Sequence, residues 1–442
     1  MKYEQELNEF INNCQRLINI NSVLSVAQEK MPFGQGIDLA LDEVLKISQE
    51  LGYEVYKDPQ GYYGYAQIGQ GELFGVLSHV DVVPEGDVNN WQSQPYEMSV
   101  RDNIIYGRGI EDDKGPTLLC LHALKILLDN GRKLNKRVRF IFGTDEETLW
   151  RCLERYNQIE ETPAMGFTPD SIFPLTYAEK GLYQFDLSIE ELINFNFCGG
   201  EAYNSVPSQA FIKRTPELEQ LAKNNNVSYQ IEADNFKIIG LSAHVKDADV
   251  GTNAIVELAK LLKELNYQSK MLDFIVEKGS NPNGELLFGN LSDSESGKLM
   301  FNIGKASFEN NKQTISVDMR IPVSFSKEVI DQELAKVIDQ YDLTFKQVDY
   351  AKPLYVDPNS FLVKSLMKAY TDITKDYAAK PLATGGATFA RTMPNCVSFG
   401  PTFAQAISSA HQANESVSIE DCQQALEIYL RAFELLVLEE EK

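Results

Sequence analysis

Apolar residues recur at helical spacing near the start of the chain. The pattern over 7–18 predicts one helix, and the pattern over 37–51 predicts a second. Two short apolar runs, 73–78 and 138–142, predict strands, and a helical pattern over 116–128 lies between them. This order of strand, helix and strand predicts an α/β domain.

The pattern changes from about Leu182 onward. Apolar and polar residues alternate over 183–189 and 314–320, around a helical pattern near 253–265, so we predict a separate α+β unit inserted into the first domain. The last long helix is amphipathic and opens at Ser418 and Asp421, the spacing of a capping box. The predicted boundaries are 1–181 for the first part of the main domain, 182–353 for the inserted unit and 354–442 for the second part.

Composition limits the kinds of partner that we expect. The 442 residues carry a formal net charge of -23, which argues against binding nucleic acid or an anionic membrane. The first thirteen residues resemble no secretory signal, and no apolar run is long enough to span a bilayer. Six scattered cysteines fit reduced thiols in core positions. We therefore expect a cytoplasmic protein.

The chain has only four histidines, and His79 comes directly after the apolar run 73–78. Ligands bind at the carboxyl ends of strands in open α/β sheets, and a histidine there can ligate a metal while Asp81 fixes its other nitrogen. A histidine beside a strand is more often structural when it is considered alone. His122 lies inside the predicted helix 116–128 and matches no site, so we expect it to be structural.

Acidic residues crowd the segment 107–115, where Asp112 stands between glycines just before a helix. A carboxylate bridging two divalent ions would relieve the repulsion, whereas the alternative is a solvated loop whose acids favour the helix N-terminus. Taken alone, the segment favours the solvated loop. Its glycines lack the spacing of a phosphate-binding loop.

A second group of acids follows the run 138–142 at Asp145, Glu146 and Glu147. Neighbouring side chains point in different directions, so one glutamate can ligate metal while the other acts as general base in metal-assisted hydrolysis. Asp170 and His411 add further donors. Five residues together offer nitrogen and oxygen ligands for two metals that share one carboxylate: His79, Asp112, Glu147, Asp170 and His411.

With these motifs in this order, the chain resembles the dinuclear zinc peptidases that include carboxypeptidase G, succinyl-diaminopimelate desuccinylase and bacterial dipeptidase V. The resemblance covers nearly the whole chain and is strongest to the dipeptidase V branch. It implies an α/β catalytic domain with a mostly parallel central sheet, interrupted by an inserted α+β lid domain. The segments that carry it are 78–84, 107–116, 145–147, 169–170, 240–244 and 410–415.

The resemblance also implies a role for each site residue. His79 and Asp170 would bind one metal, Glu147 and His411 the other, and Asp112 would bridge them. Glu146 would be the base that activates a metal-bound water, and Asp81 would orient His79. A cis peptide is expected between Asp112 and Asp113.

In the inserted unit, His244 matches a lid histidine that stabilises the developing oxyanion, and Arg320 matches an arginine that grips a substrate carboxylate. Asn204 and Gly386 are further candidates for binding substrate, although a packing or surface role competes for Arg320 and Asn204. The stretch 245–250 lacks the proline usual in the family. An enlarged lid of this kind takes the place of a partner subunit, so a monomer is expected.

Three functions remain open at this point. The first is a dipeptidase that cleaves short peptides, and the second is an amidohydrolase of the same family acting on N-acyl or N-succinyl amino acids. The third is a metal-binding regulatory protein without activity, which is disfavoured because every matched residue is present. The two divalent ions are expected to be zinc, with manganese or cobalt as alternatives.

Overall fold

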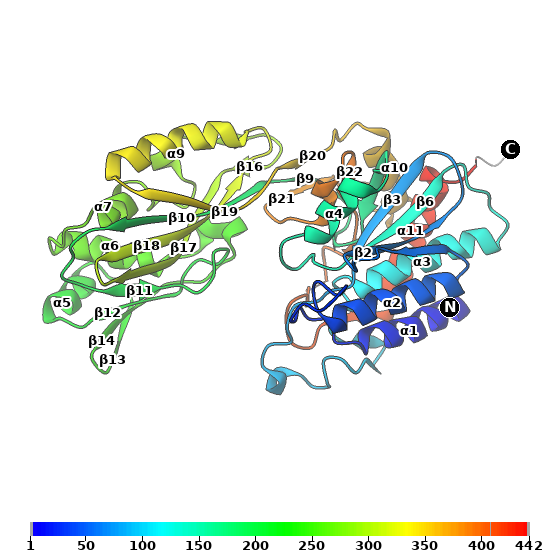
Figure 1. Cartoon of the computed structure of the whole chain (residues 1–442), viewed down its shortest axis with the longest axis horizontal. Helices are drawn as coiled ribbons and strands as arrows, with labels where there is room; N and C mark the ends of the chain where they lie inside the picture. The colour runs from blue at the N-terminus through cyan, green and yellow to red at the C-terminus, as the bar shows by residue number, and fades with distance from the viewer. Residues whose placement is uncertain (1–2, 407, 440–442) are drawn as a thin grey trace. The chain divides into compact units, whose positions relative to one another are not determined.

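The computed structural model describes residues 3–406 and 408–439, which form two compact units (Figure 1). The first unit contains the described residues up to Tyr177, Val356–Leu382 and those from Thr388 onward. The second contains Ala178–Tyr355 and Ala383–Ala387. The segment 383–387 thus groups with the inserted unit, whereas the sequence boundaries assigned it to the main domain.

The first unit is built on a mixed sheet. Its strand order is β1-β2-β6-β3-β7-β22-β9-β20, with β21 paired to β9. The central strands β6, β3, β7 and β22 are parallel, and the strands beyond them on both sides are antiparallel. The strands that lie wholly in the first unit are β1 (Glu54–Lys57), β2 (Tyr63–Ile68), β3 (Leu73–His79), β6 (Arg137–Gly143), β7 (Met165–Thr168) and β22 (Cys396–Ser398). At the end of this order, β9 (Thr176–Glu179) and β21 (Leu382–Thr384) run across the boundary between the units, and β20 (Leu354–Tyr355) is counted with the second unit.

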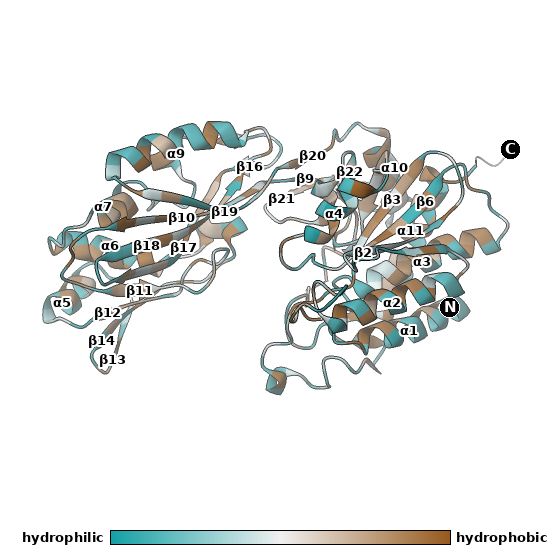
Figure 2. Ribbon diagram, in the orientation of Figure 1, coloured by the Kyte–Doolittle hydropathy of each residue, from teal (hydrophilic) through white to brown (hydrophobic). Residues whose placement is uncertain are grey.

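Six helices belong to this unit among the described residues. They are α1 (Glu4–Ile18), α2 (Gln35–Glu50), α3 (Lys114–Asp129), α4 (Arg151–Ile159), α10 (Phe361–Thr374) and α11 (Ile419–Leu436). Helix α3 packs against α1 and α11 and is buried on nearly every side, as its continuous apolar sequence requires. Figure 2 shows polar and apolar stripes on α1 and α2, which cover the outside.

Smaller elements complete the first unit. The ribbon β24-β5-β4 comprises β4 (Ser99–Arg101), β5 (Ile104–Tyr106) and β24 (Ser416–Ser418), and β8 (Ser171–Ile172) pairs with β23 (Pro401–Thr402). Short 3-10 helices are η1 (Val88–Asn90) and η3 (Phe389–Thr392). Ser418 is the N-cap of α11, because its Oγ accepts the Asp421 N–H at 2.9 Å. The predicted helix start at Ser418 is confirmed.

The second unit is built on an antiparallel sheet of order β13-β14-β12-β11-β17-β18-β10-β19. Burial alternates along β10, so each face of that strand meets a different environment. The strands are β10 (Gly181–Glu190), β11 (Phe197–Gly199), β12 (Gln209–Lys213), β13 (Tyr229–Glu232), β14 (Asn235–Ile239), β17 (Met300–Glu309), β18 (Lys312–Ile321) and β19 (Thr344–Ala351).

Helices of the second unit share one apolar core with this sheet. They are α5 (Pro216–Asn224), α6 (Ala254–Glu264), α7 (Lys270–Glu277), α8 (Glu285–Phe288) and α9 (Lys327–Tyr341), with the 3-10 helix η2 (Val245–Val250) and the small ribbon of β15 (Ser292–Asp293) and β16 (Gly297–Lys298). The predicted fold class, a mostly parallel α/β sheet with a separate α+β unit, is confirmed. No helix in the described part of the chain combines the length and apolar character needed to cross a membrane.

The cysteines depart from the prediction at one position. Cys14, Cys120, Cys152, Cys396 and Cys422 are free and buried, as expected of core residues, but Cys198 is exposed. It lies on β11, where successive side chains alternate between the two faces and its neighbours Phe197 and Gly199 take the buried side. The interpretation of Cys198 as core filler is therefore wrong.

Candidate metal centre

Three neighbouring parallel strands carry the predicted site residues at one edge of the first sheet. His79 is the last residue of β3, Glu146 and Glu147 follow β6, and Asp170 follows β7. Strand β3 pairs in parallel with both β6 and β7, so these three carboxyl ends lie side by side. The apolar residues stop where each strand ends, and because the strand ends are neighbours, the polar side chains that follow lie together.

Two loops bring Asp112 and His411 to the same edge. The two oxygens of Asp112 contact different imidazoles: Oδ1 lies 2.9 Å from His79 Nε2, and Oδ2 lies 2.9 Å from His411 Nε2. His79 Nε2 also lies 3.8 Å from Asp170 Oδ2, and His411 Nε2 lies 3.2 Å from Glu147 Oε2. Asp112 thus stands between two histidine and carboxylate pairs. The expected cis peptide between Asp112 and Asp113 is confirmed.

Donor atoms in this cluster are close enough to share metal ions. One group is His79, Asp112 and Glu147, another is His79, Glu146 and Asp170, and the ligand atoms of each lie within 4.8 Å of one another. The side chain of His79 is fully buried, whereas that of His411 is 54% exposed. The cluster therefore runs from the protein interior to a surface that small molecules can reach.

Buried carboxyl groups crowd the cluster, and added positive charge would stabilise their ionised forms. Burial raises the pKa of Glu146 and Glu147 above their ordinary values, and burial together with the charge of Asp112 raises the pKa of Asp170 to about 8. Hydrogen bonds to Asp112 and Glu147 raise the pKa of His411 to about 11. A proton on His411 thus balances carboxylates that a divalent cation would balance more effectively.

Unpaired oxygens point to the same need. Glu147 Oε1, Asp81 Oδ1 and Asp113 Oδ1 are buried and have no hydrogen-bond partner. A buried carboxylate oxygen without a partner is costly, and ligation of a cation is one way of satisfying it. The mixed nitrogen and oxygen donors of the cluster therefore fit divalent metals.

Asp81 lies behind His79, but its main chain makes the shorter contact. His79 Nδ1 is 2.9 Å from the Asp81 carbonyl oxygen and 3.6 Å from Asp81 Oδ1. The carboxylate accepts the Glu147 N–H at Oδ2, 3.1 Å away. With the proton on Nδ1, His79 presents Nε2 to the cluster, and Asp81 connects the strand ends of His79 and Glu147.

The other predicted residues belong to the second unit. His244 is exposed and is the N-cap of η2, so the stretch without the expected proline forms a 3-10 helix. Although the residue as a whole is exposed, the surrounding protein removes water from its imidazole, and this desolvation and the charge of Arg320 lower the pKa of His244 to about 4, which leaves it neutral at physiological pH. Asn204 is exposed, and its carbonyl oxygen accepts the Val245 N–H at 2.9 Å.

Arg320 is only 4% exposed, and the buried carboxylate of Asp318 occupies two of its donors. Arg320 Nε lies 2.9 Å from Asp318 Oδ1, and Nη2 lies 3.0 Å from Oδ2. Its Nη1 donates to the Gly385 carbonyl at 3.1 Å, in the same loop as Gly386. Nothing in the sequence indicates that Arg320 already has an anionic partner.

His122 lies in the core of the first unit. It is 2% exposed, and its Nε2 lies 3.1 Å from Asn13 Nδ2. Burial lowers its pKa to about 4, so it is held neutral. The prediction of a structural histidine agrees with this position.

Glu111 and Glu415 have no role predicted from the sequence, although both lie within the motifs 107–116 and 410–415. Glu415 is 1% exposed and faces the segment that carries Asp112, and Glu111 is 8% exposed. Their position close to predicted ligands is visible in the sequence, but their burial is not.

An α/β sheet with imidazoles and carboxylates gathered at its strand ends is the architecture of a metal-dependent hydrolase. The family model described as "Peptidase family M20/M25/M40" matches residues 75–435 of this chain. A Staphylococcus aureus (strain bovine RF122 / ET3-1) protein named "Putative dipeptidase" is 33% identical over 471 residues, which cover 99% of each chain. The chain belongs to peptidase family M20/M25/M40 and is a hydrolase of the metallopeptidase class.

Solved structures share the fold at lower sequence identity. An M20 family metallo-carboxypeptidase from Sulfolobus solfataricus has a TM-score of 0.61 at 16% identity, covering 97% of this chain and 99% of that one. Human carnosine dipeptidase 1 has a TM-score of 0.59 at 14% identity, covering 98% and 96%. Aminoacylhistidine dipeptidase from Vibrio alginolyticus also has a TM-score of 0.59 at 14% identity, covering 99% and 98%. At these identities the likeness concerns the fold.

Proposed function

We propose that the protein is a dipeptidase that hydrolyses the amide bond of short peptides with two divalent metal ions. The observation that carries the proposal is the position of Asp112, whose two carboxylate oxygens each lie 2.9 Å from a different histidine. The dipeptidase name of a relative that matches this chain over its whole length supports the choice of substrate class.

The residues that would hold the ions are those of the cluster. His79 and Asp170 would hold one ion, Glu147 and His411 would hold the other, and Asp112 would contribute to both. Zinc suits this set of imidazole and carboxylate donors, and manganese or cobalt can replace it. When bound, the ions supply Lewis acidity, which polarises a carbonyl and makes a water molecule more acidic.

Glu146 is the proposed general base. Its side chain belongs to the same donor group as His79 and Asp170, which puts its carboxylate where a water molecule held by that group could give it a proton. Glu146 takes a proton from the attacking water and returns it to the leaving amine. Asp81 keeps His79 in the tautomer that leaves Nε2 free.

The roles of four residues in the second unit stay predictions from the resemblance. His244 would stabilise the developing oxyanion, and its neutral state at physiological pH allows it to donate a hydrogen bond without a charge. Arg320, Asn204 and Gly386 would bind the substrate. A monomeric state and a cytoplasmic location are likewise retained as proposals.

A substrate panel tests this function. Metal-stripped protein is supplied with zinc, manganese or cobalt and given free dipeptides beside N-acetyl and N-succinyl amino acids. Cleavage of free dipeptides that is lost when their amine is blocked supports the proposal. Preference for the acylated compounds would instead identify an amidohydrolase, and metal binding without any turnover would favour a regulatory protein.

A further inference from the structure

Glu415 links the loop of His411 to the segment of Asp112. It lies four residues after His411 and is 1% exposed. Among the described residues, its carboxylate accepts hydrogen bonds only from N–H groups: the backbone of Gly109 (3.0 Å), Glu111 (2.9 Å) and Asp112 (3.2 Å), and the buried guanidinium of Arg108 (2.6 Å). One side chain from the first loop therefore fixes the backbone of the second.

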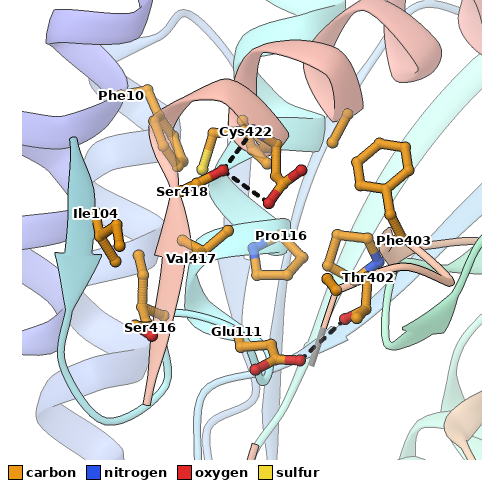
Figure 3. A pocket seen from close by; sticks show the side chains of 17 residues that line it. Phe10, Ile104, Glu111, Pro116, Thr402, Phe403, Ser416, Val417, Ser418 and Cys422 are labelled. Atoms are coloured by element: carbon orange, nitrogen blue, oxygen red, sulfur yellow. Dashed lines mark hydrogen bonds between the residues drawn. The ribbon is translucent and has the colours of Figure 1, made fainter. Parts of the chain in front are cut away.

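Glu111 makes the reverse connection. It belongs to the segment of Asp112, and its Oε2 accepts from the Ser409 N–H (2.8 Å) and the Ser409 hydroxyl (2.9 Å). Its Oε1 accepts from the Thr402 hydroxyl at 3.1 Å, the contact drawn as a dashed line in Figure 3. Ser409 lies two residues before His411, so this carboxylate fixes the other side of the same loop.

These contacts begin where the β pairing of the two segments stops. Strand β24 pairs with β5, with Ser416 opposite Tyr106, and the Gly107 N–H still donates to the Glu415 carbonyl at 3.0 Å. Beyond this point the two segments are no longer paired, and Asp112 and His411 both lie on the unpaired stretches. Without another connection, the distance between these two side chains would depend on loops that no strand pairing holds together.

We infer that Glu111 and Glu415 form a clamp that positions His411 against Asp112 for metal binding. This inference rests on the proposed dinuclear site. Both glutamates are positioning residues, since their carboxylates contact backbone, hydroxyl and guanidinium groups of the two loops. Hydrogen bonds to buried carboxylates are stronger than neutral ones, so these contacts can hold the loops at the spacing that a shared ion requires.

The clamp predicts different effects for the same amide substitution at its two positions. In Glu111→Gln, the amide oxygen can accept from Ser409, while the amide nitrogen donates to the Thr402 hydroxyl, which can turn to accept. In Glu415→Gln, an amide nitrogen must face N–H donors, and the buried Arg108 loses its countercharge. Glu111→Gln should therefore preserve the clamp, whereas Glu111→Ala and Glu415→Gln should disrupt it.

Zinc titration against a chromophoric chelator, on the full chain stripped of metal, tests the inference. Loss of groups that support metal ligands typically weakens metal affinity by about 10- to 100-fold, and we expect this loss for the second equivalent of zinc in Glu415→Gln and Glu111→Ala. Glu111→Gln should bind as the wild type does. Glu420→Gln, at an exposed position in the first turn of α11, is the matched control and should also bind normally.

Circular dichroism of each metal-free variant separates lost folding from lost binding. If Glu415→Gln does not fold, the comparison of Glu111→Ala with Glu111→Gln decides, because equal affinity in these two overturns the clamp. Wild-type protein that binds two zinc ions, together with folded Glu415→Gln and Glu111→Ala that bind them equally well, also overturns the clamp and leaves the proposed function intact. Wild-type protein that binds no zinc overturns both.

Discussion

Breaking the pair of Asp318 and Arg320 should destabilise the second unit. Asp318 is fully buried and Arg320 is 4% exposed, and Asp318 also accepts from Gln184 Nε2 at 2.7 Å. In Asp318→Asn an amide nitrogen must face one of three donors, and the guanidinium keeps its charge without a partner. Breaking a buried ion pair in this way costs about 3 to 5 kcal/mol, so we expect a loss of about 3 kcal/mol.

Hydrogen exchange of the β10 and β18 amides measures this loss. A change of about 3 kcal/mol should speed global exchange of these strands by about a hundredfold, since each 1.4 kcal/mol is tenfold. Burial raises the pKa of Asp318, so the comparison belongs at pH 8, on the alkaline side of the ordinary carboxyl range. The two tryptophans, Trp91 and Trp150, both lie in the first unit, and their fluorescence checks that this unit is unchanged.

The control for this experiment is a surface pair of the same unit. Lys336 and Glu333 are 69% and 39% exposed, and Glu333→Gln should cost no more than about 0.5 kcal/mol. If exchange in Asp318→Asn matches that of Glu333→Gln, the Arg320 guanidinium does not depend on Asp318. The structural reasoning would then be wrong.

Three further predictions concern the catalytic groups and a buried histidine. Glu146→Gln should keep both metal ions but lower kcat by about 10²- to 10⁴-fold, the usual loss when a proton-transfer group is removed, and unchanged turnover would refute the assignment. His244→Ala should lower kcat by about 10²- to 10³-fold with normal metal content, and an effect on KM alone would exclude oxyanion stabilisation. His122 has a folded pKa of about 4 against an ordinary 6.5, so the unfolded state binds more protons between these values and stability falls as the pH falls through this range. The difference in unfolding free energy between the wild type and His122→Gln should therefore change by about 2 kcal/mol between pH 8 and pH 5, measured by tryptophan fluorescence, and a constant difference would contradict the buried neutral state.

The sequence predicted the strand ends well because local patterns determine them. The apolar run before His79 and the run before Glu146 are visible within a few residues, and parallel pairing brings their ends together. The order of the motifs added Asp112, Asp170 and His411. These residues could be grouped before any contact was known, because strand ends and metal chemistry limit where such side chains are useful.

Contacts between distant segments were not predictable in the same way. Arg108 and Glu415 are 307 residues apart, and nothing near either of them indicates that they meet. The pairing of Arg320 with Asp318 depends on side-chain direction in a buried strand, and the grouping of 383–387 with the second unit depends on hydrogen bonds from Lys180 and Arg320. Such features follow from tertiary packing, which a one-dimensional pattern does not contain.

Turnover of a free dipeptide as a function of added zinc tests the central claim most directly. Protein stripped with a chelator should be inactive, and activity should rise until two equivalents of zinc per chain are bound, with Glu147→Ala failing to recover under the same conditions. Turnover that persists in fully stripped protein, or full activity in Glu147→Ala, would contradict a dinuclear metal site as the source of the activity.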